Sequence, residues 1–153
     1  MKAPTRRNLP AALAAAGLAA AASAQAPPQK QVHYRNGQKP DATPLYNSAI
    51  SFGDLVFLSG TGVTSPPDVA GQTRRVLESL ERRLLLTGSS MQQVLKCTVF
   101  LADLADYGAM NDAFRGAFGP NPPVRTTVAV SGIPAKNCRV EIEIIAYRES
   151  PNA

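Results

Sequence analysis

The side chains best suited to chemistry lie on the last two expected strands of the chain. Side chains alternate between the faces of a strand, so Arg125 and Thr127 share one face of the first, and Glu141 and Glu143 share one face of the second. Since the apolar residues of the second strand need the face that helices cover, we expect all four polar side chains on the other face. A polar face can simply meet water. This face is also expected to carry Ile145, and a mixed face suits burial against another subunit around a pocket.

The scarcity of histidine and cysteine limits other chemistries. The chain has one histidine, His33, and two cysteines, Cys97 and Cys138, with no CxxC pair. These are too few ligands for a zinc site, and a Ser/His/Asp triad would require His33 to fold back across the domain. The cysteines could pair in an oxidising compartment, but their spacing does not require it, and we expect them reduced and partly buried.

The elements that position these residues follow from hydrophobic periodicity and turn signals. The 153 residues suit one domain. We expect two helices, one between Asp68 and Gly88 and one ending at Gly119, and strands near 31–35, 46–52, 55–61, 94–101, 125–130 and 139–146. The order β-β-β-α-β-α-β-β indicates an α+β fold, a six-stranded, mixed and mostly antiparallel sheet with two helices packed on one face.

Single residues mark where these elements begin and end. Gly53 supplies the positive φ of a hairpin turn, Asp68 is expected to cap the first helix and Gly88 to stop it, and Asp103 or Asp106 can cap the second. The stripe of the second helix is Tyr107, Met110, Phe114 and Phe118. Leu95, Cys97, Val99 and Leu101 are expected on one face of strand 94–101.

The first 24 residues are typical of a signal peptide. A positive start, Lys2, Arg6 and Arg7, precedes an Ala/Leu/Gly run too short to span a bilayer, and Ala22-Ser23-Ala24 has the A-x-A pattern of a cleavage site. Arg6-Arg7 resembles a twin-arginine export signal, while an ordinary secretory signal remains open. We expect a periplasmic or secreted protein with no stable membrane association.

Removal of residues 1–24 leaves a Pro/Gln-rich linker, 25–30, and a domain, 31–150. The whole chain has a net charge of +5, but residues 1–24 hold three of the sixteen Lys and Arg and none of the eleven Asp and Glu, so the mature charge is +2. The remaining basic pairs, Arg74-Arg75 and Arg82-Arg83, are expected on a solvated helix face. No nucleic-acid partner is therefore expected.

Several ordered motifs over about residues 31–148 resemble the Rid family (reactive intermediate deaminases, also called YjgF-type). The stretches that carry the resemblance are Phe52-Gly53-Asp54-Leu55 through Ser59-Gly60, Gln72-Thr73-Arg74, Lys96-Cys97-Thr98-Val99-Phe100-Leu101, Met110-Asn111-Asp112-Ala113-Phe114, Pro123-Val124-Arg125-Thr126-Thr127-Val128 and Val140-Glu141-Ile142-Glu143. The resemblance implies a chorismate-mutase-like fold and a homotrimer with clefts between subunits. It also implies hydrolysis of small 2-imino or enamino acids, without a metal or organic cofactor.

The resemblance also assigns roles to individual residues. Arg125 matches the arginine that holds the substrate carboxylate, by two parallel hydrogen bonds that a lysine could not reproduce. Glu141 matches the acid that positions or deprotonates the attacking water. The expected substrate-binding residues are Tyr46, from the neighbouring chain, together with Ser59, Gly60, Asn111 and Thr127.

Some positions depart from the family pattern. Thr61 stands where a glutamine is usual, Thr127 replaces a frequent cysteine, and the loop between Gly60 and Gln72 is short. These changes reshape the cleft rim, so the substrate preference stays open. The alternative function is a non-catalytic trimeric module that binds small carboxylic (2-oxo) acids.

Overall fold

The computed structural model describes residues 27–149. The expected signal peptide, 1–24, and the start of the linker lie outside the described residues. The strands are β1 (Lys30–Val32), β2 (Ala49–Phe52), β3 (Leu55–Gly62), β4 (Val94–Leu101), β5 (Val124–Ala129) and β6 (Val140–Tyr147). The helices are α1 (Val69–Leu86) and α2 (Tyr107–Phe114). Two 3₁₀ turns, η1 (Met91–Gln93) and η2 (Leu104–Asp106), directly precede β4 and α2. The expected order of elements is confirmed, although β1 and β2 are shorter than predicted.

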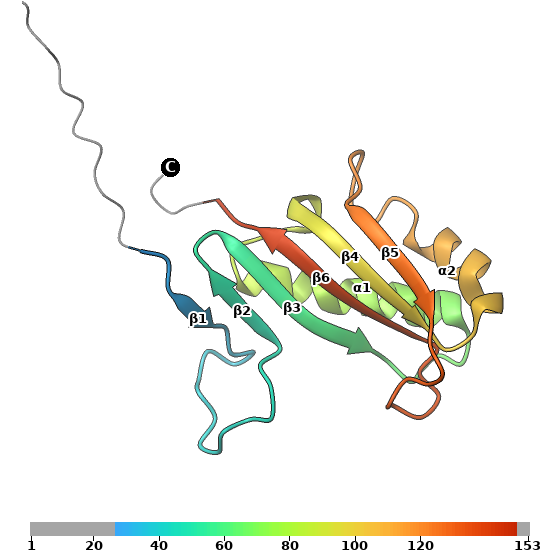
Figure 1. Cartoon of the computed structure of the whole chain (residues 1–153), viewed down its shortest axis with the longest axis horizontal. Helices are drawn as coiled ribbons and strands as arrows, with labels where there is room; N and C mark the ends of the chain where they lie inside the picture. The colour runs from blue at the N-terminus through green and yellow to red at the C-terminus, as the bar shows by residue number, and fades with distance from the viewer. Residues whose placement is uncertain (1–26, 150–153) are drawn as a thin grey trace, which may run out of the picture.

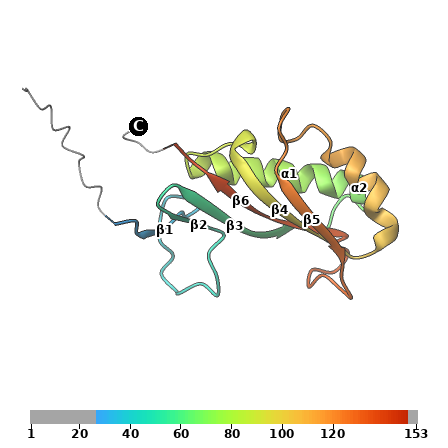
Figure 2. The ribbon, with the colours of Figure 1, turned by 45° about the horizontal axis from the view of Figure 1, so that its top comes forward.

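The strands form one six-stranded sheet in the order β1-β2-β3-β6-β4-β5. Every pairing is antiparallel except that of β4 with β5, which is parallel. Both helices cover the same face of the sheet (Figures 1 and 2), with α2 at the β5 edge. The predicted α+β architecture is therefore confirmed, and one face of the sheet lies open.

Some of the residues expected to cap the two helices do so, and one does not. Asp68 accepts a hydrogen bond from the backbone N–H of Gly71 at 2.6 Å and so caps α1, and Gly88 takes a φ of +77° just beyond its end. Asp103 caps η2 through the N–H of Ala105. Asp106 makes no side-chain cap, because it pairs with Arg139 instead.

The second helix ends earlier than predicted, at Phe114 instead of next to Gly119. Gly116 adopts a φ of +80°, a conformation that interrupts the helix. Phe118 is still buried, in a turn after the helix, with its ring centroid 4.9 Å from that of Phe114. Phe118 therefore belongs to the core although it lies beyond the end of the helix. Only a short helix covers the β5 edge.

The core lies between the two helices and the covered face of the sheet. Its largest fully buried side chains include Leu80, Leu84, Leu101, Met110, Ile142 and Ile144. The prediction that Leu95 shares a face with Cys97, Val99 and Leu101 was wrong, since its side chain is 45% exposed while theirs are fully buried. A register shift between Val94 and Lys96 inserts an irregularity in β4, which turns Leu95 outward and keeps both Val94 and Cys97 inside. None of the helices within residues 27–149 is long and apolar enough to cross a membrane.

Candidate active site

Arg125 lies on the helix-covered side of the sheet, on edge strand β5. It pairs in register with Cys97, which is completely buried under the helices. Its Nη2 donates a hydrogen bond to Oδ1 of Asn111 on α2 at 2.7 Å, and its guanidinium carbon lies 4.7 Å from the ring centroid of Phe114. The prediction that Arg125 shares the open face with Glu141 was therefore wrong.

The physical reason is that α2 is short and lies at the β5 edge. A guanidinium on the covered side of an edge strand can reach that edge while its flat face packs on an aromatic ring. Tyr107 adds a second ring, whose centroid is 6.0 Å from the guanidinium carbon. Residues of α2 thus give Arg125 an aromatic ring to pack on and an amide oxygen to donate to, and both groups are uncharged.

A pocket of about 420 Å³ opens beside this guanidinium. It is lined by Asn111, Phe114, Arg115, Gly116, Phe118, Gly119, Pro122, Pro123 and Arg125. The polar groups that contact Arg125, Oδ1 of Asn111 and the sulfur of Met110, are both neutral. The positive charge of Arg125 is thus not neutralised by these neighbours, and a carboxylate that entered the pocket would find it available.

Thr127 is the second predicted residue on this side of β5. It pairs with the fully buried Val99, and its hydroxyl oxygen is buried without a hydrogen-bond partner among residues 27–149. A buried hydroxyl is usually hydrogen-bonded, so this atom is an unsatisfied donor and acceptor, although Thr127 does not line the pocket beside Arg125. The prediction that Thr127 lies on the open face was wrong for the same reason as for Arg125.

Cys97 lies close to this group, but it does not behave as a nucleophile. Burial raises the pKa of its thiol to about 12, and the positive charge of Arg125 opposes that shift only in part. The thiol therefore stays protonated at neutral pH, so it cannot act as a thiolate nucleophile there. Within residues 27–149 both cysteines are unpaired, and both are buried more completely than expected.

Glu141 lies on the other, open face of the sheet, as predicted. It follows the buried Val140 on β6 and pairs in register with Phe100 of β4 and Gly62 of β3. Gly60 borders its carboxylate so closely that a methyl group added at this glycine would overlap it. A glycine at this position therefore gives the carboxylate its space.

Ser59 occupies the same open face. Its hydroxyl donates a long hydrogen bond, 3.5 Å, to the carbonyl of Ser48. Together with Glu143, Lys96 and Thr98 it lines a hollow of about 350 Å³ over β3, β6 and β4. Ser59 and Gly60 thus accompany the acids Glu141 and Glu143, and not Arg125.

Tyr46 lies apart from both groups. It stands in the loop between β1 and β2 and is 68% exposed. Its phenol is near enough to Arg83 on α1 to affect the pKa of that guanidinium. The structure therefore brings Arg125, Asn111 and Thr127 together, and Ser59, Gly60 and Glu141 together, but it joins neither group to Tyr46 within one chain.

The distance between the two groups is set by the sheet. Strand β4 lies between β5 and β6, so these two strands are about two strand spacings, roughly 10 Å, apart. Arg125 pairs with Cys97 and Glu141 with Phe100, so the two residues are also offset along the strands. The side chains also leave opposite faces of the sheet. One chain therefore cannot bring both to the same small ligand.

The sequence reasoning assigned Phe114 to the core and missed its contact with Arg125. The signal was present in the spacing, because Asn111 and Phe114 are three residues apart and therefore share one face of α2. Because Asn111 was already a candidate site residue, Phe114, one turn later on the same face, could have been proposed as a site residue too. Phe114 is 8% exposed, so it belongs both to the core and to the site.

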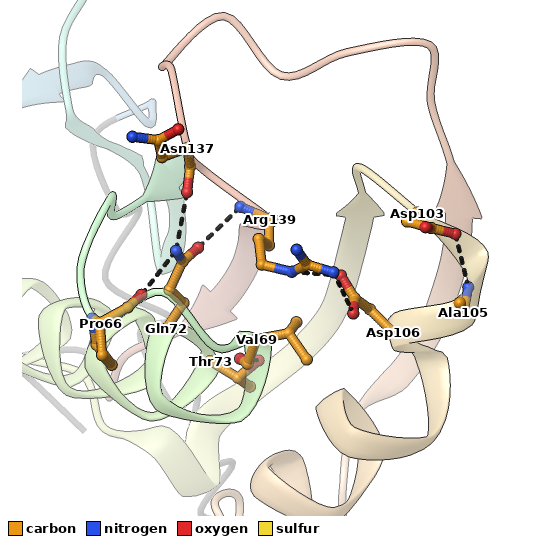
Figure 3. A network of polar contacts seen from close by, with 9 residues as sticks. All are labelled: Pro66, Val69, Gln72, Thr73, Asp103, Ala105, Asp106, Asn137 and Arg139. Carbon is orange, nitrogen blue, oxygen red and sulfur yellow. Dashed lines mark hydrogen bonds and ion pairs between the residues drawn. The ribbon is translucent and has the colours of Figure 1, made fainter.

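A buried amide, Gln72, fixes the loops at the rim of the sheet (Figure 3). Its Nε2 donates to the carbonyl oxygens of Pro66 and Asn137, each at 2.9 Å, and its Oε1 accepts from the backbone N–H of Arg139 at 2.8 Å. Arg139 in turn forms a two-pronged ion pair with Asp106, at 2.9 and 2.7 Å. The network ties the segment before β6, and with it Glu141, to α1 and to the turn η2 that precedes α2.

No group of three or more His, Cys, Asp or Glu side chains within residues 27–149 is arranged to hold a metal ion.

Comparisons with known proteins agree with this architecture. Residues 36–148 match the family described as endoribonuclease L-PSP. A RutC family protein of Pyrococcus horikoshii is 39% identical over 111 residues, covering 68% of this chain and 87% of that protein. The 2-iminobutanoate/2-iminopropanoate deaminase of Rattus norvegicus is 32% identical over 116 residues, covering 71% of this chain and 84% of that protein. The crystal structure of a YjgF family member from Neisseria meningitidis has a TM-score of 0.68 at 32% identity, covering 71% of this chain and 92% of that one.

Proposed function

The chain belongs to the Rid (YjgF-type) family, and from this membership we propose that it is a deaminase that hydrolyses small 2-imino and enamino acids to 2-oxo acids and ammonia. The observation that carries the proposal is Arg125, a guanidinium held beside a pocket by the neutral Asn111 and Phe114. A relative of similar length bears the name of a 2-imino acid deaminase. An arginine of this kind suits a substrate with a carboxylate next to the reacting carbon.

The chemistry needs little more than a water and a base. The carbon of an imine is electrophilic, so water adds to it and forms a bond from oxygen to carbon, while the imine nitrogen takes a proton. The carbinolamine then loses ammonia as its hydroxyl proton leaves and the C=O bond forms. Glu141 is the base that takes the proton from water and returns it to the nitrogen. Arg125 holds the carboxylate throughout.

The two groups of residues act on one substrate only if two copies of the chain meet. Arg125 and Glu141 lie on opposite faces of the sheet. We therefore place Arg125, Asn111 and Thr127 of one subunit against Ser59, Gly60 and Glu141 of the next, in a closed trimer with three equal sites. The exposed Tyr46 is then free to approach a neighbouring site.

Subunit mixing tests this arrangement directly. Arg125→Ala and Glu141→Gln variants are each expected to be inactive as pure trimers. In trimers refolded from an equal mixture, roughly one quarter of the sites would combine an intact Arg125 with an intact Glu141 from the neighbour, and activity should return to that level. Mixed trimers that regain none, or a monomer mass by light scattering, would overturn the two-copy site.

The second candidate is a non-catalytic trimer that binds small 2-oxo acids. The observation in its favour is that Arg125, Asn111 and Phe114 line a pocket that does not include Glu141. Such a pocket could hold a carboxylate without turning it over. The Glu141→Gln experiment in the Discussion separates the two candidates.

We further propose export, on the composition of residues 1–24. The exported enzyme would act on imines released by amine or amino-acid oxidation outside the cytoplasm. N-terminal sequencing of the protein from its native host should give a start near Gln25. A soluble protein that retains Met1 in the cytoplasmic fraction would refute the export.

A further inference from the structure

A third pocket lies away from the two already described, against the C-terminal half of α1. It has a volume of about 440 Å³ and is lined by Arg35, Ser79, Arg82, Arg83, Leu85 and Leu86. Arg35 follows β1, which forms the sheet edge farthest from β5 and α2 (Figure 1). The pocket shares no residue with the two groups of the candidate active site. Its size falls in the range of pockets that bind small molecules, about 300–1,000 Å³.

Arg83 is the unusual residue of this pocket. Its Nε and Nη1 atoms are buried and have no hydrogen-bond partner within the described part of the chain. Guanidinium nitrogens out of contact with water are costly unless they are paired, so arginines in such places normally contact an anion or several carbonyl oxygens. The residues that the structure describes supply neither to these two atoms.

The surroundings of Arg83 add positive charge instead of compensating it. Burial lowers the pKa of this guanidinium, and the charges of Arg35 and Arg82 lower it further, while only the phenol of Tyr46 acts in the opposite direction. None of the residues that line the pocket is acidic. The pocket is therefore an uncompensated cluster of three guanidinium groups from two separate segments.

The rim of the pocket is apolar. Leu85 is 64% exposed and Leu86 is 55% exposed, although both stand near the end of a helix whose other leucines are buried. Two large neighbouring leucines left in water next to three arginines form a surface with a charged part and an apolar part. Ligands with the matching distribution carry an anionic head on a hydrocarbon tail or ring.

We propose that this pocket is a binding site for an amphiphilic carboxylate, whose head pairs with Arg83, Arg82 and Arg35 while its tail lies on Leu85 and Leu86. The site is separate from the one that holds the substrate, and it does not depend on the proposed deaminase activity. The planar arginine fork favours a carboxylate over a halide, and the leucines favour a chain of several carbons over acetate.

Calorimetry with octanoate tests the site, with Arg125→Ala as the background so that the substrate pocket is disabled. Two comparison ligands separate the contributions: acetate has the carboxylate head without the hydrocarbon tail, and octanol has the tail without the carboxylate. Octanoate should bind more tightly than either. Arg83→Met should weaken octanoate binding by about tenfold or more, the loss expected for a hydrogen bond to a charged group. Arg75→Met, an exposed arginine on the same helix outside the pocket, should leave it unchanged.

A stability measurement on Arg83→Met and a second variant, Leu86→Ser, distinguish a loss of binding from a loss of structure. Arg83→Met removes a buried charge with no partner at two of its nitrogens, so circular dichroism should show a fold at least as stable as that of the parent. Leu86→Ser should weaken octanoate but not acetate. Equal octanoate affinity in Arg83→Met and its parent would overturn the proposal, as would a short single-stranded RNA that binds the pocket in preference to octanoate.

Discussion

Arg125 on edge strand β5 donates a hydrogen bond from Nη2 to Oδ1 of Asn111 on α2, at 2.7 Å. The amide accepts without neutralising, so the guanidinium is oriented and keeps its charge. The aromatic face of Phe114 holds the same group from another direction.

Replacement of Arg125 by alanine should abolish recognition of the substrate carboxylate. Truncation of one partner in a desolvated charge pair costs about 2–5 kcal/mol, so the affinity for a 2-oxo acid should fall by that amount. Arg125→Lys should recover only a small part, because an ammonium cannot fork or stack. Calorimetry measures both, with Arg74→Ala on the exposed side of α1 as the control. Unchanged affinity in folded Arg125→Ala would reject the role.

Asn111→Asp changes the charge opposite Arg125 and almost nothing else. The new carboxylate would pair with the guanidinium and compete with the substrate, so 2-oxo acid affinity should fall by about tenfold or more at neutral pH. Acidification that protonates the aspartate should restore part of the binding, and this recovery would not follow from a merely structural role. Asn111→Ala, which leaves Arg125 less well oriented but unpaired, should bind more tightly than Asn111→Asp. The reverse order would contradict the orienting role.

Gln72→Leu should destabilise the fold more than any exposed substitution. It leaves the carbonyls of Pro66 and Asn137 and the N–H of Arg139 without their partner (Figure 3). The expected loss is about 2–4 kcal/mol in the free energy of unfolding. Thr73→Val is the matched control, because its buried hydroxyl donates only to the carbonyl of Val69 within α1. A urea titration that finds equal midpoints for the two variants would refute the importance of the network.

The sequence predicted the elements better than it predicted the faces of the edge strand. For β6, Val140, Ile142 and Ile144 leave no doubt about which side is buried, and Glu141 lies opposite as expected. For β5 the alternation separates two sets of residues that are both only weakly apolar, and Val128 of the more apolar set is 41% exposed. What decides the orientation is the parallel pairing with β4 and the short α2, and neither is visible in the local pattern.

Long-range contacts and strand irregularities were also beyond the sequence reasoning. The hydrogen bonds of Gln72 to Asn137 and Arg139 span more than sixty residues. The shift between Val94 and Lys96 has no glycine or proline to mark it, so regular alternation wrongly put Leu95 on the same face as Cys97. The caps at Asp68 and Gly88 were predicted correctly because their causes are local.

His33 should make the stability of the fold depend on pH. Its Nε2 lies 2.8 Å from the hydroxyl of Ser51, and burial, followed by the charge of Arg148, lowers its pKa below the ordinary 6.5. The unfolded chain therefore binds the proton more tightly than the folded one. Stability should be complete above pH 6.5 and decline as the pH falls from there towards the folded pKa. Urea midpoints at several pH values should show this decline in the wild type and a flatter profile in His33→Gln.

The choice between enzyme and binding module depends on Glu141. Glu141→Gln keeps the size and hydrogen bonding of the side chain and removes the base, so 2-oxo acids should still bind while turnover falls by roughly 10²–10⁴. Gly60→Ala should act through the same carboxylate, since the added methyl group displaces it, and turnover should fall without a matching loss of binding. The assay generates an imino acid with an amino-acid oxidase and follows its decay above the spontaneous rate. Wild-type protein that gives no acceleration over several substrates would establish the binding module. Equal acceleration by wild type and Glu141→Gln would keep the reaction and transfer the role of base to Glu143, the next acid on the same face.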